Sequence, residues 1–155
     1  MATAQEQAGT PDSFAVNGRF KITLDDSAGG GEAWFHEASG LEMTMDTLEY
    51  RQGGEQNPRK LPGPPKYTNI VLTRGITTSK KFFEWVKKCA NNAAAGDITR
   101  AGGTIALVDQ TGADIIAWTF ERGFPCRYEG PRISAADGGL ALERIEIAHE
   151  GLKIV

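Results

Sequence analysis

The segment EYRQGGEQNPRKLPGPPKYTNIVLTRG, from Glu49 to Gly75, begins with a strand pattern, becomes a run of glycine, charge and proline, and returns to a strand pattern at Tyr67. A compact domain seldom contains a loop of more than about a dozen residues, and such loops are usually functional or disordered. We therefore predict an extended loop at residues 51–66 whose role lies outside its own domain. Its prolines reduce the entropy that it loses on binding.

The residues before this loop predict one long strand, from Ala33 to Tyr50, with an irregularity in it. Met43 and Met45 alternate with polar residues, whereas the apolar Leu48 falls on the opposite parity. A shift of parity within a strand indicates a bulge or bend. We place it near Thr47.

The N-terminal part of the chain carries the clearest alternation. Residues 1–12 are small and polar, so we expect them to be flexible. Apolar residues then share one parity over a predicted strand at residues 14–26, and these are Phe14, Val16, Phe20, Ile22 and Leu24. We expect a single domain over residues 13–155.

One helix is predicted, at residues 78–95. Its apolar stripe at helical spacing includes Phe82, Val86 and Cys89. A hydroxyl residue at position 77, 78 or 79 is expected to cap its start, and Gly96 to end it.

The remainder again predicts strands. Residues 103–109 and 114–123 predict a β-hairpin with QTGA as its turn. Residues 124–134 are expected to be irregular or an edge strand, because they contain Pro125 and Pro131. Gly151 is expected to carry a bulge. Six or seven strands and one helix predict a mainly β protein, a small antiparallel β-barrel or sandwich flanked by one α-helix.

Composition excludes several classes of partner. The chain has 155 residues and a net charge of −3, which gives no reason to expect binding to nucleic acid or anionic membrane. It has no apolar run of about 18 residues and no signal-peptide pattern. We expect no membrane anchor and assembly in a bacterial cytoplasm, with Cys89 and Cys126 as reduced thiols.

Enzyme signatures are weak. His36 and His149 each stand alone, and GGGE at residues 29–32 is not followed by the Lys-Ser/Thr of a phosphate loop. We expect no catalytic residue, metal or cofactor. We favour core packing as the role of five aromatic residues, and a ligand pocket is the alternative. These residues are Trp34, Phe35, Phe82, Phe83 and Trp85.

Several motifs together resemble those of one family. They are SGLEM, EYRQGGE, RKLPG followed by KYTNIVLTRG, FFEWV at the start of the helix, and the closing ERIEIAHEGLKIV. In this order they resemble the contractile-tail tube proteins of bacteriophages and the inner-tube proteins of phage-tail-like extracellular contractile injection systems. The resemblance covers most of the chain from Phe14 onward.

The resemblance implies a tail-tube fold and an assembly. Hexameric rings would stack into a hollow tube that is driven through a target envelope and conducts cargo. The implied partners are further copies of the chain, a sheath protein, baseplate and terminator proteins, and cargo in the lumen. Phage, bacteriocin-like tail and injection device all remain open as the particle.

Carried onto this sequence, the family's inter-subunit arm is the loop at residues 51–66. Its expected contact residues are Arg51, Gly53, Gly54, Pro58, Arg59, Lys60, Leu61, Pro62, Pro64, Pro65 and Lys66. A conduit also needs a polar wall, and the candidates for a lumen face are Glu42, Thr44, Asp46, Arg144 and Glu146.

Two alternatives accompany this reading. A tube-initiating or tube-terminating ring protein would share the fold but would not polymerise alone into long tubes. A monomeric small-molecule-binding β-barrel would instead line a cavity with its aromatic residues.

Overall fold

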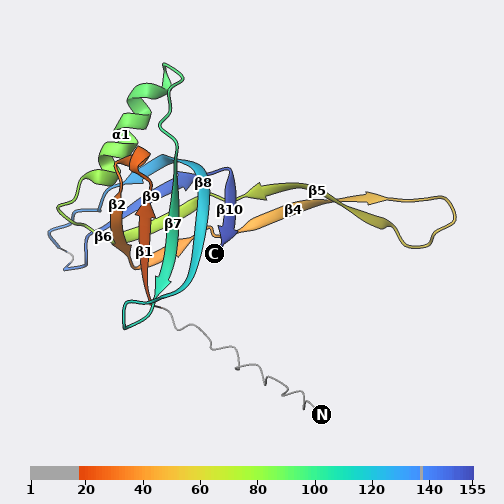
Figure 1. Cartoon of the computed structure of the whole chain (residues 1–155), viewed down its shortest axis with the longest axis horizontal. Coiled ribbons are helices and arrows are strands. Elements are labelled where there is room, and N and C mark those ends of the chain that lie inside the picture. Colours follow the sequence, from red (N-terminus) through yellow and green to blue (C-terminus); the bar gives the residue numbers. More distant parts are fainter. Residues whose placement is uncertain (1–17, 137) are drawn as a thin grey trace, which may run out of the picture.

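The computed structural model describes residues 18–136 and 138–155 (Figure 1). The predicted flexible segment, Phe14 and Val16 lie outside the described residues. The described elements in chain order are β1 Arg19–Leu24, the 3-10 turn η1 Asp26–Ala28, β2 Gly31–Phe35, β3 Glu37–Ser39, β4 Met43–Tyr50, β5 Arg59–Tyr67, β6 Ile70–Gly75, α1 Lys81–Ala93, β7 Ala101–Val108, β8 Asp114–Glu129, β9 Leu142–Ala148 and β10 Gly151–Ile154.

Antiparallel pairing organises these strands into two sheets. The larger sheet has the order β2-β1-β7-β8-β9-β6-β3, with β10 paired to β8, and β4 and β5 form a second sheet by themselves. Strand pairs are antiparallel throughout the described residues. The prediction of a mainly β protein with one helix is confirmed.

The two edges of the larger sheet are consecutive segments of the chain. β2 pairs with β1 and β3 pairs with β6, although only His36 lies between β2 and β3. The His36 N–H donates to the Thr73 carbonyl oxygen at 3.2 Å. The sheet therefore curls until its edges meet at one bend, but no ladder joins β2 to β3 within the described parts of the chain. The expected barrel is not closed.

The interior of this curled sheet is apolar. Fully buried side chains come from β1, β6, β7, β8 and β9, and the largest of them are Ile22, Ile70, Leu72, Ile105, Phe120 and Ile147. Their positions on the strands follow the period of two that the sequence shows, because alternate residues of a strand face the same side.

The helix begins later than predicted. α1 covers Lys81–Ala93, and its N-cap is Lys80, which makes no capping hydrogen bond with its side chain. The prediction of a hydroxyl cap at residues 77–79 is wrong, because the Thr77 hydroxyl instead accepts from the Ser79 N–H at 3.3 Å in the turn before the helix. Packing against the sheet thus holds this helix in place of a cap.

Aromatic packing fixes α1 on the sheet. Phe82, Trp85 and Cys89 are its buried residues. The rings of Phe35 and Phe82 meet edge to face with centroids 5.4 Å apart, a favoured aromatic geometry. The Trp85 Nε1 donates to the Thr99 carbonyl oxygen at 3.3 Å. Core packing is therefore confirmed for Phe35, Phe82 and Trp85, whereas the other two aromatic residues of that prediction, Trp34 and Phe83, are exposed.

Strand β8 runs through the region predicted to be irregular. It continues to Glu129 and pairs with β9 across a register shift between Pro125 and Arg127. Since proline lacks an N–H, it is tolerated in a sheet at such a bulge. Only the part of the predicted segment after Glu129 lies outside a strand.

Strands β9 and β10 continue one another along β8. Ala148 faces Phe124 and Gly151 faces Glu121, so the register is the same on both sides of the gap. The bulge predicted at Gly151 is therefore wrong, and the ladder is instead interrupted at residues 149–150, opposite Arg122 and Gly123. Arg122 has φ +52°, a left-handed conformation that non-glycine residues seldom adopt.

The predicted loop is largely a β-hairpin. β4 and β5 form a ribbon that projects from the body of the molecule (Figure 1). The strand resumes at Arg59, and only residues 51–58 connect the two strands. Its prolines favoured a loop, but β5 has one partner strand, so N–H groups on its other edge need none. The long strand predicted before the loop is three strands, β2, β3 and β4.

Candidate assembly surfaces

The hairpin, which we call the arm (residues 43–67), has a defined register with one irregularity. Met45 pairs with Pro65 and Thr47 pairs with Pro62. The register therefore shifts between Met45 and Thr47, at the position predicted for the bulge or bend, although the prediction placed it in β4. Asp46 alone faces two residues of β5, so the extra residue lies in β5. A Cβ on Gly63 would approach the Asp46 carbonyl oxygen to 2.8 Å, so glycine suits this close approach.

The root of the arm is held by a close backbone contact. Gly40 has φ +80°, and a Cβ there would lie 2.0 Å from the Asn69 carbonyl oxygen. The Thr68 N–H donates to the Glu42 carbonyl oxygen at 3.4 Å. His149 adds a second anchor, because its Nε2 lies 2.9 Å from the Thr68 carbonyl oxygen.

The arm exposes large apolar side chains. Every residue of β4 is exposed, and on β5 so is Leu61. The exposed fractions are 54% for Met43, 55% for Met45, 59% for Leu48, 46% for Tyr50 and 50% for Leu61. An isolated two-stranded hairpin is marginally stable in water, so these side chains indicate a surface that another molecule covers.

Charged residues on the arm are mostly paired with one another. Lys66 Nζ lies 2.5 Å from a carboxylate oxygen of Asp46. Arg59 donates to both oxygens of Glu55, at 3.0 and 2.6 Å, which raises the pKa of Arg59. Exposed pairs of this kind are screened by water and add little stability.

All eleven predicted arm residues lie on β5 or on the loop that connects it to β4. Pro58 and Gly63 are partly covered and the other residues of segment 51–66 are exposed. Sequence reasoning missed the apolar residues of β4, Met43, Met45, Leu48 and Tyr50, because an alternating strand normally buries one face. The parity shift at Thr47 was the signal that could have found them.

The predicted lumen residues fall in two places. Arg144 and Glu146 are alternate residues of β9, on the face opposite the buried Ile145 and Ile147. Thr44 and Asp46 share one face of β4 in the separate sheet of the arm, and Glu42 lies just before that strand. The structure of one chain does not bring these two groups together, and the lumen face stays a prediction.

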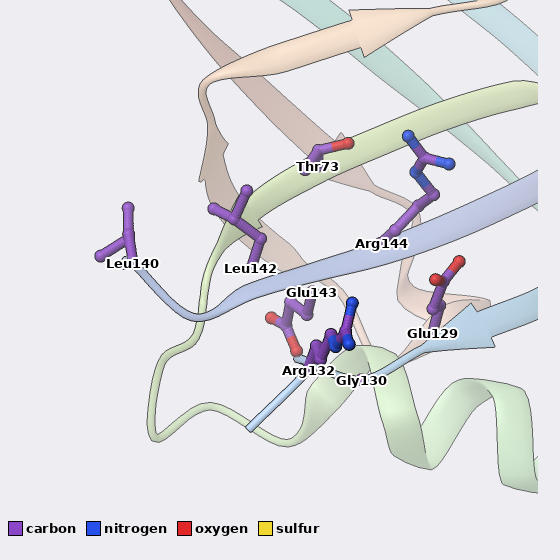
Figure 2. A pocket seen from close by; sticks show the side chains of 8 residues that line it. All are labelled: Thr73, Glu129, Gly130, Arg132, Leu140, Leu142, Glu143 and Arg144. Carbon is purple, nitrogen blue, oxygen red and sulfur yellow. The ribbon is translucent and has the colours of Figure 1, made fainter. Parts of the chain in front are cut away.

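A hollow lies at the end of the body where β8 ends and β9 begins. Figure 2 shows its lining side chains, and its volume is about 350 Å³. The lining residues are Thr73, Glu129, Gly130, Arg132, Leu140, Leu142, Glu143 and Arg144. Leu140 is 79% exposed at its rim.

A buried ion pair lies beside this hollow. Arg74 and Glu143 are both buried and pair with each other, and the Tyr128 hydroxyl donates to the other Glu143 oxygen at 2.9 Å. The Arg74 guanidinium also lies over the rings of Phe35 and Phe82, at 5.4 and 4.9 Å. Burial, and then the bond to Glu143, raise the pKa of Tyr128.

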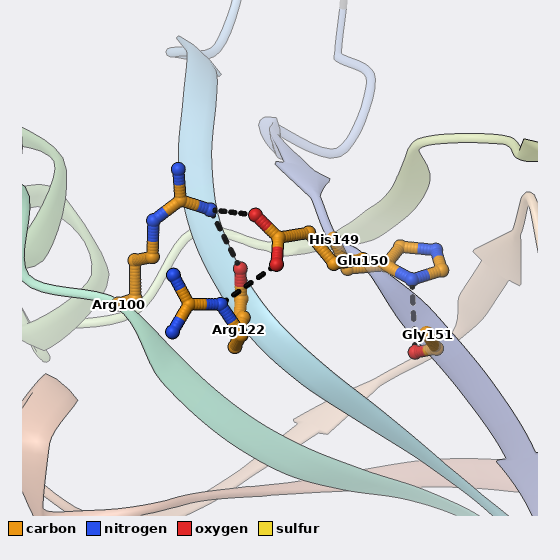
Figure 3. Close-up of polar contacts among 5 residues, drawn as sticks. All are labelled: Arg100, Arg122, His149, Glu150 and Gly151. Carbon is orange, nitrogen blue, oxygen red and sulfur yellow. Dashed lines mark hydrogen bonds and ion pairs between the residues drawn. The ribbon is translucent and has the colours of Figure 1, made fainter.

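An exposed cluster surrounds the interruption between β9 and β10 (Figure 3). The Glu150 carboxylate accepts from Arg100 at 2.8 Å and from Arg122 at 2.7 Å. The His149 Nδ1 lies 3.0 Å from the Gly151 carbonyl oxygen. These contacts fasten the interrupted strand to β8.

The two cysteines differ in exposure. Cys89 is buried on α1 and Cys126 is exposed on β8, and both are free thiols. Burial is the main cause that raises the pKa of each thiol. No group of three or more His, Cys, Asp or Glu side chains suited to a metal occurs in residues 18–136 and 138–155. The helix of this described part is too short and polar to cross a membrane.

Comparison with solved structures shows the same fold in contractile injection systems. A chain of the extended-state sheath–tube complex of the extracellular contractile injection system PVC is 24% identical, covers 99% of both chains and has a TM-score of 0.78. The tube-terminating cap of the anti-feeding prophage AFP is 28% identical, with 96% of this chain and 98% of that chain covered and a TM-score of 0.76. Hcp1 from E. coli EAEC 042 is 14% identical over 89% and 91%, with a TM-score of 0.53.

Comparison with curated proteins yields no match. A family description does match nearly the whole chain, because residues 16–153 fit the T4-like virus tail tube protein gp19 family. This stretch contains both sheets, the helix and the entire arm. The chain therefore belongs to the T4-like virus tail tube protein gp19 family and is a tail tube protein of the kind found in contractile injection systems.

Proposed function

We propose that the chain is the structural subunit of the inner tube of a contractile tail or injection particle. Six copies form a ring, and rings stack into a hollow tube that is driven through a target envelope and conducts cargo. The observation that carries this proposal is the arm, a separate two-stranded sheet with five exposed large apolar side chains, on a chain of a tail tube family.

Identical copies are the partners that the arm needs first. A ribbon without a core gains stability only when other surfaces cover it. Contacts between a projecting element and a different surface of the next copy are head-to-tail, so they close around a ring or continue as a filament. Both are features of a tube built from rings.

The remaining partners follow from the structures that share the fold. These structures include a sheath–tube complex, a sheath/tube terminator and a baseplate. We propose corresponding contacts here, with a sheath protein outside the tube and with terminator and baseplate proteins at its ends. Assembly in the bacterial cytoplasm without a membrane anchor is part of the same proposal.

The conduit needs no chemistry of its own, and we propose no enzymatic role and no cofactor. The imidazole of His149 supports this reading, because its two nitrogens face backbone carbonyl oxygens of Thr68 and Gly151. We assign the lumen wall to the polar faces that carry Arg144 and Glu146 on β9, and Thr44 and Asp46 on β4. Cargo inside the tube would meet these side chains.

A terminating ring protein is the second candidate. The AFP tube-terminating cap is the relative of 28% identity, slightly above the 24% of the PVC sheath–tube chain. The two functions differ in one property, since a main tube subunit polymerises alone into long tubes and a cap stops at a ring.

The deciding experiment is electron microscopy of the purified chain in negative stain, combined with sedimentation. Long tubes support the main-subunit function, and isolated rings support the cap. A monomer at high concentration would overturn both, and melting that depends on a small molecule would then favour the binding barrel.

A shortened arm tests the role of the hairpin directly. We expect replacement of residues 45–65 by Asn-Gly to leave a folded monomer, because Thr44 and Lys66 are a cross-strand pair that a two-residue turn can join. Insertion of Gly-Ser at the exposed turn around Thr111 is the matched control. Tubes at the wild-type yield from the shortened chain would contradict the proposal.

A further inference from the structure

The arm is joined to the body by two short segments, residues 40–42 and residues 68–69. β4 and β5 form a sheet of their own, so in the described parts of the chain no strand ladder continues from the arm into the larger sheet. The direction in which the arm leaves the body therefore depends on contacts made at these two segments.

His149 lies where the second segment meets the body. Its Nε2 is 2.9 Å from the Thr68 carbonyl oxygen, and its Nδ1 is 3.0 Å from the Gly151 carbonyl oxygen, the contact drawn in Figure 3. The centroid of its ring lies 5.6 Å from that of Tyr67 and 6.2 Å from that of Phe120. A single side chain thus links the root of the arm to β8 and β10.

Both ring nitrogens of His149 face a hydrogen-bond acceptor. A carbonyl oxygen only accepts, so each of the two contacts requires an N–H on the ring. A neutral imidazole has one N–H and one lone pair, whereas the charged imidazolium has two N–H groups. Only the imidazolium can therefore donate to Thr68 and to Gly151 at once, and either neutral tautomer directs a lone pair at a carbonyl oxygen.

The contact with Thr68 is the one that a neutral ring would lose. Gly151 belongs to β10 and is paired with Glu121 of β8, so its carbonyl oxygen is held by the larger sheet. Thr68 lies in the connection between β5 and β6, outside any strand. Of the two carbonyl oxygens, that of Thr68 is therefore the one that can move away from an unprotonated nitrogen.

The charged groups around the ring have partners of their own. The titratable and charged side chains on the elements packed around it are Glu42 and Tyr67 at the arm root, Glu121 and Arg122 on β8, Glu146 on β9, Glu150, and Lys153 on β10. Each carboxylate of this set accepts a hydrogen bond from another side chain. The two carbonyl contacts are thus the ones that respond to the charge of His149 itself.

We propose that His149 is a pH-sensitive latch on the arm, which holds the arm root to the body as an imidazolium and releases Thr68 as a neutral ring. Imidazole changes its charge between about pH 5 and about pH 8, so the latch is closed in acid and open in mild alkali. On the proposed tube function a released arm assembles less readily, because the freedom that it gains is lost when other copies cover it. That consequence rests on the tube function, whereas the latch is a property of the single chain.

Hydrogen exchange at the arm root tests the latch. Mass spectrometry of the unassembled full chain follows residues 66–70 at about pH 5.5 and about pH 8, with each rate divided by that of the unfolded chain at the same pH. We expect protection in the wild type to fall about fivefold between the two values, which corresponds to one hydrogen bond. The NMR resonances of the His149 ring nitrogens should titrate with the same midpoint as this protection.

Three variants separate the latch from other effects of pH. His149→Gln keeps amide donors whose number does not change with pH, so its protection should be the same at both values. His149→Leu has no donor, and its protection should be low at both. The control is His36→Gln, since His36 is exposed and donates through its backbone N–H, and it should behave as the wild type does.

Wild-type protection that does not change with pH would overturn the inference. So would a fall that persists in His149→Gln or disappears in His36→Gln. The comparison of the wild type with His149→Gln stands even if His149→Leu does not fold. Because the measurement is made on unassembled chains, a chain that forms no tubes would overturn the tube function and leave the latch untouched.

Discussion

At the scale of single residues, the best-defined polar contact is buried and lies away from the arm. Arg74 is held between two aromatic rings and pairs with Glu143, which also accepts from Tyr128. A buried pair of charges adds little net stability, but removal of one partner leaves the other uncompensated. This contact joins β6, β8 and β9 beneath the helix.

We expect Glu143→Ala to lower the free energy of unfolding by about 3–5 kcal/mol, because Arg74 would stay buried without its carboxylate. Urea unfolding measures the change. Glu121→Ala is the control, since Glu121 pairs with Lys153 where both side chains are more than half exposed, and it should cost much less stability than Glu143→Ala. Equal losses in the two variants would show that Arg74 is not isolated from water.

Tyr128 predicts a dependence on alkaline pH. Burial and the bond to Glu143 raise its pKa above the usual value. The folded chain therefore holds this proton more tightly than the unfolded chain. The resulting stability is complete below about pH 10 and is lost as the pH rises through the folded pKa.

Tyr128→Phe should accordingly lose less stability than the wild type between about pH 8 and about pH 11. Urea unfolding at both pH values measures the difference, and Tyr50→Phe on the arm is the control. If the stability of Tyr128→Phe fell with pH as steeply as that of the wild type, the assignment of this pH dependence to Tyr128 would be wrong.

At the scale of elements, the backbone at the root of the arm is closely packed at Gly40. Gly40 and Gly54 both have positive φ, of +80° and +96°, but only Gly40 faces a neighbouring backbone group within 4 Å, the Asn69 carbonyl oxygen. The two glycines therefore separate the cost of a left-handed conformation from the cost of a clash.

We expect Gly40→Ala to destabilise the chain by more than Gly54→Ala, with a difference above about 1 kcal/mol. The added Cβ at position 40 would have to displace the start of β6, whereas the one at position 54 meets open space. Thermal and urea unfolding of both variants measure this difference. Equal losses of stability in the two variants would mean that the backbone at the root of the arm accommodates the added Cβ without a cost in free energy.

At the scale of the whole molecule, the assembly should depend on apolar contact more than on charge. The arm's ion pairs are exposed and internal to it, whereas its large apolar side chains do not belong to the core formed by residues 18–136 and 138–155. Salt screens the ion pairs and leaves the apolar contacts unchanged.

We expect the polymerised fraction to change less than about twofold between about 0.1 M and about 1 M NaCl, since the Debye length falls from about 10 Å to about 3 Å over that range without affecting apolar burial. Sedimentation of preformed tubes measures it, with the chain that has the shortened arm as the control without tubes. Dissolution at high salt would show that Arg51 and Lys60 carry the contact through charge.

The sequence by itself determined the elements whose signals are local. Alternation gave β1 and the β7–β8 hairpin, helical spacing located α1, and the change of parity at Thr47 located the bulge of the arm. These features depend on neighbours along the chain, so a single sequence records them. The sequence motifs indicated the family as well, and residues 16–153 match that family as a whole.

Only the tertiary structure decided what depends on residues far apart. Proline made segments 59–66 and 124–129 look irregular, yet both are strands, because a free edge or a bulge removes the need for an N–H. Similarly, the apolar residues of β4 looked like one face of a core strand. Their exposure follows from pairing with β5 alone, and pairing between distant segments is written in no local pattern.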